Sequence, residues 1–286
     1  MSSPQQFVNY ALGGWELAVC SSLLLQGVLL GQTARYLANG FHRTDPTIMR
    51  VWVAGLLVLS LGRNLFGIQL MYEQDTAHYL NFPAALGEWL SARFDASFLI
   101  SGVLVYYVQM FFCWRLWTLC RQIWLPSAFA LLFSAGLVCS ILAVPLAHMK
   151  QPVRWAAAYL SVYFVSDFLL CGSMMFFLLR DSRSQRVSRD TATVLNRIAR
   201  ITIQSALPSA ACALALLASS QKNPDYVAGN SALAITVVLT QLLPMSYAYS
   251  AMWTLNARKG IRAEMTRSRD ATGTDQSGWG AAASKA

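Results

Sequence analysis

Residues 97–117 read SFLISGVLVYYVQMFFCWRLW, and Arg115 is the one charged residue in this run. A helix needs about 20 consecutive, mostly apolar residues to cross a hydrocarbon core of about 30 Å. The run has this length and lacks the strict polar–apolar alternation of a barrel strand. It therefore predicts a membrane-spanning helix.

The same pattern recurs along the rest of the 286 residues. Apolar stretches cover approximately residues 11–38, 48–72, 96–119, 123–147, 155–179, 199–219 and 229–255. The chain is 56% hydrophobic and 12% charged, about half the charged fraction of a soluble protein. The first stretch is too long for a secretory signal. The sequence therefore predicts an all-α membrane protein, a seven-transmembrane-helix bundle.

The chain divides into one membrane domain and two flanking segments. Residues 1–10 are predicted to form a short external N-terminus, and residues 11–258 the seven-helix domain. Residues 259–286 are rich in Ser, Thr, Gly, Ala and charge. Such a segment buries too little apolar surface to fold, so a disordered basic cytosolic tail is expected.

The basic residues give the predicted topology a direction. The loops after the first, third and fifth stretches and the tail carry 17 of the 22 Lys and Arg residues, and the other face carries 4. The positive-inside rule places the N-terminus outside and the C-terminus in the cytosol. The net charge of +9 then predicts contact with anionic lipids at the cytosolic face rather than with nucleic acid. Plasma and internal membranes are not distinguished.

The sequence lacks the motifs that several kinds of catalysis and cofactor binding require. The three histidines lie in or next to predicted loops, and there is no His-Glu-x-x-His zinc motif and no Gly-x-Ser-x-Gly elbow. The apolar stretches contain no lysine that could hold retinal, since the four lysines are Lys150, Lys222, Lys259 and Lys285. The sequence predicts a protein without catalysis, metal or cofactor.

Three ionisable residues lie within the apolar stretches, namely Glu16, Arg63 and Asp167. Such groups are costly in a membrane and normally face the bundle interior with a partner. Glu16 and Arg63 have matching predicted depths in the outer half, which favours an ion pair, with Asp95 as the second choice of partner for Arg63. The pair would either hold helices together or line an outward-facing cavity.

Asp167 lies near the middle of its stretch. Gln109 and Gln241 have comparable depths in two other stretches, which predicts a polar cluster of the three residues. This cluster would be either structural or a ligand or proton site.

Glycine and proline give two further predictions. Gly27 and Gly31 are predicted to allow close helix packing inside the bundle. Pro244 is predicted to kink its helix.

Several runs together resemble an uncharacterised seven-helix membrane family of mushroom-forming (basidiomycete) fungi, domain of unknown function 6534. They are GVLLGQ at 27–32, VQMFFCWRLW at 108–117, Ser166-Asp167, VLNRIARITIQSAL at 194–207 and the stretch from Tyr249 to Arg258. The resemblance implies a topology but no established activity. The family has an acidic-plus-His segment where this chain has Leu61-Gly62-Arg63-Asn64. The resemblance also indicates polar residues at the predicted cytosolic end that deserve interest: Arg115, Asn196, Arg197, Gln204, Asn256 and Arg258.

Two functions remain open at this point. Seven spans, an external N-terminus and basic inner loops are typical of a receptor or sensor that binds a cytosolic protein partner. The alternative is a small-solute or proton-linked transporter that uses Asp167 with Gln109 and Gln241.

Overall fold

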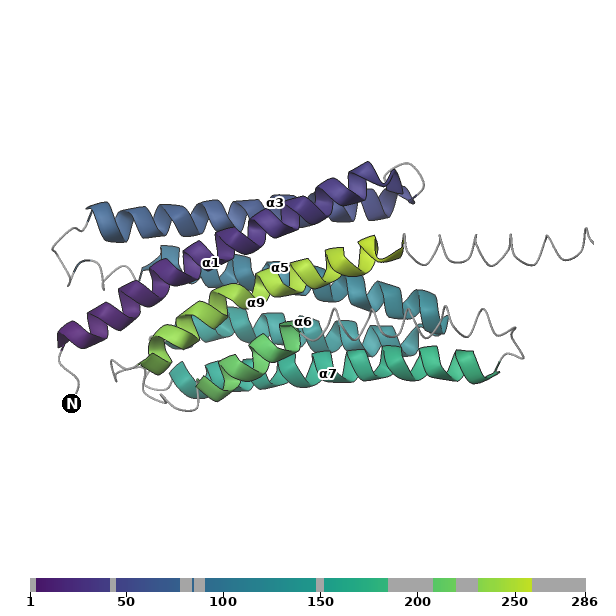
Figure 1. Cartoon of the computed structure of the whole chain (residues 1–286). Coiled ribbons are helices and arrows are strands. Elements are labelled where there is room, and N and C mark those ends of the chain that lie inside the picture. Colours follow the sequence, from purple (N-terminus) through teal and green to yellow (C-terminus); the bar gives the residue numbers. More distant parts are fainter. Residues whose placement is uncertain are drawn as a thin grey trace, which may run out of the picture.

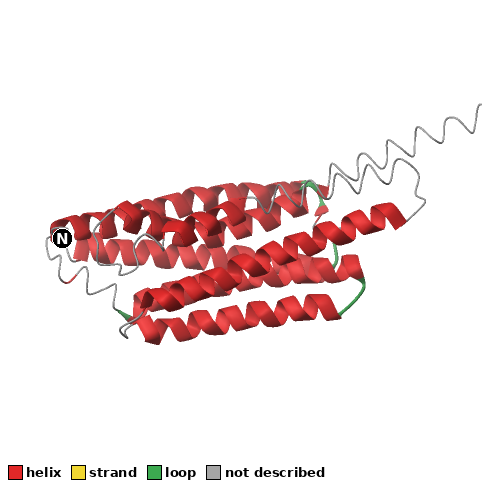
Figure 2. Cartoon of the chain, turned by 90° about the horizontal axis from the view of Figure 1, so that it is seen from below, coloured by secondary structure: helices red, strands yellow, loops and turns green. Residues whose placement is uncertain are grey.

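The computed structural model describes residues 4–41, 45–77, 84, 91–147, 152–184, 208–219 and 231–258. Within these residues the regular structure is helical throughout, and the helices lie side by side in an elongated bundle (Figures 1 and 2). The elements are α1 (Pro4–Ala38), α3 (Thr47–Tyr72), the π-helical turn η1 (Glu73–Ala77), α5 (Ala92–Cys120), α6 (Trp124–Ala147), α7 (Pro152–Ser184) and α9 (Ser231–Asn256). A further apolar helix, Pro208–Ser219, lies between α7 and α9 in the sequence.

The helical prediction is confirmed, and the number of spans is confirmed in part. Among the described residues, five helices are long and apolar enough to cross a membrane, namely α1, α3, α5, α6 and α9. The other two predicted stretches contain shorter apolar helical segments, Phe164–Phe177 and Pro208–Ser219. The first helix begins at Pro4 rather than near residue 11, so residues 4–10 belong to α1. The predicted tail, 259–286, lies outside the described residues.

Helix direction defines the two ends of the bundle. The helices α1, α5 and α9 all finish at one end, called here the Arg258 end, and begin at the opposite end, called the Trp15 end (Figure 1). Helix α5 is central, because it contacts α3, α6, α7 and α9. Helix α1 packs along α9 and also contacts α3. The interior is therefore built around α5 and the α1–α9 pair.

The outer surface is apolar. Large hydrophobic side chains on four different helices are strongly exposed: Leu24 (75%), Val58 (70%), Leu131 (72%) and Phe168 (72%). In water such a surface would be unfavourable, since each buried square ångström of apolar area stabilises by about 25 cal/mol. Facing lipid tails, the same side chains carry no such penalty. The distribution fits helices immersed in a bilayer.

Gly14 allows the closest approach between α1 and α9. A Cβ atom at Gly14 would lie 2.9 Å from the Cα of Ala234. The prediction that Gly27 and Gly31 pack closely inside the bundle is wrong, because both lie exposed on α1 with nothing within 4 Å of a Cβ placed there. Their four-residue spacing puts both on one helix face, but it does not say which way that face points.

Gly14→Val is expected to lower the free energy of unfolding by about 1–3 kcal/mol, because the added atoms overpack a backbone contact that neither helix can avoid. Gly27→Val is the matched control, since it changes helix propensity in the same way without a steric clash. Unfolding of both variants in detergent micelles measures the difference. Equal stabilities would contradict the close α1–α9 contact.

Candidate functional site

A buried polar cluster joins four helices in the middle of the bundle. It consists of Ser22 and Gln26 from α1, Arg63 and Asn64 from α3, Ser101 from α5 and Gln241 from α9. We call these six residues the Arg63 cluster. Every member is buried, with Arg63 only 4% exposed. Such a cluster is costly in a membrane unless its hydrogen bonds are satisfied.

Neutral groups from all four helices surround the Arg63 guanidinium. Its Nε donates to Ser101 Oγ at 2.9 Å, and its Nη1 donates to Ser22 Oγ at 2.8 Å and to Asn64 Oδ1 at 3.3 Å. Its Nη2 donates to the backbone carbonyl of Gln241 at 2.7 Å and to the Oε1 of the same residue. A guanidinium carries five N–H donors, so these contacts use its full capacity. The Arg63 guanidinium therefore has no donor left for a ligand, whereas the Nε2 of Gln26, a member of the same cluster, is buried without a hydrogen-bond partner among the described residues.

The predicted Glu16–Arg63 ion pair is wrong. Glu16 is exposed on α1, and neither it nor Asp95 is among the hydrogen-bond partners of Arg63. Glu16 and Arg63 were predicted to lie at the same depth, but the Glu16 side chain points away from Arg63. Ser22 follows Glu16 by six residues, which is about 240° around the helix. Ser22 is the α1 residue that points at Arg63.

Pro244 lies in the α9 turn that Arg63 contacts. Proline has no backbone N–H, so Pro244 inside α9 cannot donate to the carbonyl of Thr240, four residues earlier. Arg63 donates to the carbonyl of the next residue, Gln241, and so holds this turn of α9 to α3.

Gln109 and Asp167 form a second polar contact, between α5 and α7. Gln109 Nε2 donates to Asp167 Oδ1 at 3.3 Å, so this half of the predicted three-residue cluster is confirmed. Gln241 is not part of it, because its side chain contacts Arg63. Gln109 is fully buried, and its Oε1 has no hydrogen-bond partner in the part of the chain that the structure describes. The pair therefore retains hydrogen-bonding capacity, unlike the Arg63 guanidinium.

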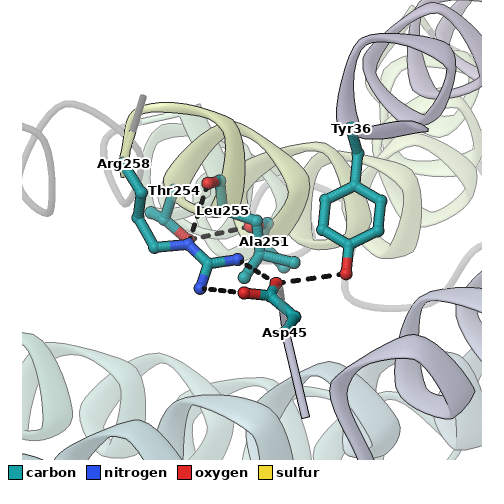
Figure 3. Close-up of polar contacts among 6 residues, drawn as sticks. All are labelled: Tyr36, Asp45, Ala251, Thr254, Leu255 and Arg258. Atoms are coloured by element: carbon teal, nitrogen blue, oxygen red, sulfur yellow. Dashed lines mark hydrogen bonds and ion pairs between the residues drawn. The ribbon is translucent and has the colours of Figure 1, made fainter. Parts of the chain in front are cut away.

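A third polar group lies at the Arg258 end, where Tyr36, Asp45 and Arg258 meet (Figure 3). We call these three residues the Asp45 latch. Arg258 donates from Nη2 to Asp45 Oδ2 at 2.7 Å and from Nη1 to Oδ1 at 3.3 Å, and the Tyr36 hydroxyl donates to Oδ2 at 3.1 Å. The Arg258 guanidinium also lies over the Phe41 ring at 5.4 Å. The latch ties the end of α9 to α1 and to the connection between α1 and α3.

Asn256 strengthens the same junction. Its Nδ2 donates to the backbone carbonyl of Gln32 at 2.8 Å and to the Gln32 Oε1 at 2.7 Å. The structure thus brings together two of the polar residues indicated by the resemblance, Asn256 and Arg258. Three others, Asn196, Arg197 and Gln204, lie outside the described residues.

Arg115 lies near the same junction. It belongs to the last turns of α5, is half-buried and is close enough to Arg258 for the two charges to act on each other.

Asp45, the acidic centre of the latch, was not predicted from the sequence. Its position just before Pro46 and α3 is typical of a helix cap, but α3 has no side-chain cap.

The apolar surface and the five long apolar helices define a class: this chain is a multi-pass membrane protein. Residues 163–260 match a family of unknown function, DUF6534, which confirms the resemblance over this part of the chain. The matched region contains Asp167, Gln241, Asn256 and Arg258. Searches of curated proteins and of solved structures found no significant match. Among the described residues, no group of three or more His, Cys, Asp or Glu is arranged to hold a metal ion.

Proposed function

We propose that this protein is a receptor-like or sensor-like seven-span membrane protein without catalysis, with the N-terminus outside and the Arg258 end in the cytosol. The Asp45 latch carries the proposal. It is an ion pair that holds α9 against the α1–α3 connection at the end where a cytosolic partner would bind. The transmission element is α9, which runs from the Trp15 end to the latch.

The distribution of arginine supports this orientation. Among the described arginine side chains, Arg93 lies at the Trp15 end and Arg63 lies inside the bundle. The others lie at the Arg258 end, as judged from helix direction: Arg35, Arg50, Arg115, Arg121, Arg180 and Arg258. Positively charged residues accumulate at cytosolic helix ends.

The latch has the properties of a two-state element. Its carboxylate side chain is only 2% exposed, whereas the Arg258 side chain is 28% exposed and lies just beyond the last residue of α9. Separation of α9 from the α1–α3 connection would break both hydrogen bonds between Arg258 and Asp45 and expose this end of the bundle. A ligand that favours either arrangement would shift the population between them.

Asp45→Asn is expected to change which cytosolic proteins lie near the C-terminus, because it removes the charge that holds Arg258. A promiscuous biotin ligase fused to the C-terminus in intact cells measures this neighbourhood, with the segment 259–286 present or deleted. Glu73→Gln is the matched control, since it breaks an ion pair with Arg93 (2.5 Å) at the Trp15 end. Identical labelling in all variants, or labelling of external proteins, would contradict the proposal.

The Gln109–Asp167 contact supports a second candidate, a proton-linked or small-solute transporter. A carboxylate held by one side-chain hydrogen bond inside a membrane bundle is typical of a proton relay. Under this alternative, Asp167→Asn is expected to abolish proton-coupled flux in reconstituted vesicles while keeping the hydrogen bond from Gln109. Ser173→Ala on α7 is the control, because its hydroxyl bonds only within its own helix. Flux unchanged by Asp167→Asn would exclude this role.

A further inference from the structure

We propose that Arg115 and Arg258 form a binding site for a phosphate-bearing anion at the Arg258 end of the bundle. The site lies where α5 and α9, which contact each other, both finish. Only the effect of the anion on the Asp45 latch rests on the proposed function. The existence of the site is independent of any receptor role.

The hydrogen-bond donors of the Arg115 side chain have no acceptor among the described residues. It lies five residues before the end of α5, about 7 Å along the helix axis, and its side chain is half-buried. Its guanidinium makes no hydrogen bond or ion pair within the described residues. The contrast with Arg63 is direct, because all five donors of that buried arginine are satisfied. A partly buried guanidinium without an acceptor is unfavourable, and an anion would relieve this cost.

The surroundings of Arg115 are strongly positive. Arg258 acts on it electrostatically, and Arg50 in turn lies close enough to Tyr36 to affect its hydroxyl. Of the acidic side chains that the structure describes, Asp45 alone lies at this end, and Arg258 already occupies both of its oxygens. One carboxylate against several arginines leaves an excess of positive charge. An anion is the ligand that balances it.

Phosphate fits this arrangement better than a neutral polar group. The planar guanidinium donates two parallel hydrogen bonds to phosphate oxygens, and a second guanidinium adds a charge that neutral ligands do not use. The depth of Arg115 near the helix end corresponds to the headgroup layer of a bilayer. The source of the phosphate is either a lipid headgroup or a soluble phosphate ester, which share the chemistry.

Binding at this site would act on the latch. Two of the five donors of Arg258 remain after its contacts with Asp45 and with the Leu255 carbonyl (3.0 Å). A phosphate that is held by Arg115 and these two donors places a second negative charge beside the Asp45 carboxylate, and the repulsion between the two anions favours the open latch. The anion would then be a regulator of the proposed conformational change.

The test uses the full chain in nanodiscs of neutral phosphatidylcholine, with phosphatidic acid added in one arm and soluble glycerol 3-phosphate in the other. Native mass spectrometry counts bound molecules and gives their affinity. We expect one tightly bound molecule of phosphatidic acid or glycerol 3-phosphate, and a loss of at least about tenfold in affinity for Arg115→Gln, since one charge-assisted contact is removed. Binding in the lipid arm alone identifies a headgroup, and binding in both arms identifies a soluble ester as sufficient.

Arg121→Gln is the matched control, because Arg121 is exposed, follows α5 directly and carries the same charge. Equal loss in the two variants, or no phosphatidic acid or glycerol 3-phosphate retained by the wild-type protein, would overturn the site. Arg115→Lys should restore part of the affinity, and thermal unfolding confirms that each variant is folded. The latch is tested separately with Asp45→Asn in pure phosphatidylcholine. Failure of the anion site and failure of the proposed function therefore give different results.

Discussion

Arg63→Met is expected to lower the free energy of unfolding by about 2–4 kcal/mol in detergent or bicelles. The substitution removes five hydrogen bonds, four of which join α3 to α1, α5 and α9 and one of which lies within α3. Interhelical hydrogen bonds in membranes contribute about 0.6 kcal/mol each, and up to about 1.7 kcal/mol. Methionine fills most of the volume and satisfies none of the polar groups left behind. The backbone carbonyl of Gln241 beside Pro244 would lose its partner as well.

A competing effect acts in the opposite direction. Burial of a guanidinium without a carboxylate partner costs several kcal/mol, and methionine removes that cost. The four-helix arrangement of bonds is expected to outweigh it, because the neutral partners remain buried after the substitution. Ser101→Ala, which removes one of the five bonds, should cost about 1 kcal/mol or less. A variant more stable than the wild type would show that desolvation of the charge dominates.

Asp45→Asn is expected to lower the free energy of unfolding by about 1–3 kcal/mol. The value lies between that of an exposed ion pair and that of a buried one, because the Asp45 side chain is 2% exposed and the Arg258 side chain 28%. A double-mutant cycle with Arg258→Gln isolates the pairwise contribution, which should be about 1 kcal/mol. The measurement is chemical unfolding of the four proteins in the same detergent.

The control for this cycle is the other ion pair, Arg93–Glu73, in which the two side chains are 59% and 21% exposed. Exposed pairs contribute little, so Glu73→Gln should change the stability by less than about 1 kcal/mol. A coupling of zero between Asp45 and Arg258 would mean that the latch does not hold α9. High salt should weaken the Arg93–Glu73 pair more than the latch, since buried pairs are screened less.

Apolar run length was enough to predict the helices. Each of the seven predicted stretches contains a helical segment among the described residues, although α1 begins at Pro4 rather than near residue 11. The same reasoning identified Arg63 and Asp167 as residues that need partners, because few ionisable groups are tolerated in a membrane. Depth along each helix could be estimated from the rise per residue.

Partners could not be predicted, because they depend on how each helix is rotated. Glu16 and Ser22 lie on the same helix, but only Ser22 points at Arg63. The same ambiguity misplaced Gly27 and Gly31, whereas Gly14, without a glycine four residues away, makes the close contact. Asp45 was missed because a carboxylate before a helix is usually a cap, and only its distance from Arg258 reveals its role.

The latch itself can be measured most directly by double electron–electron resonance in nanodiscs. Spin labels are introduced through unnatural amino acids at Ile48 on α3 and Trp253 on α9, which are 64% and 38% exposed and flank the latch. We expect one narrow distance distribution for the wild type and for Glu73→Gln, and an added, longer distance for Asp45→Asn. A single unchanged distance in Asp45→Asn would contradict the claim that the Asp45 latch holds this end of the bundle closed.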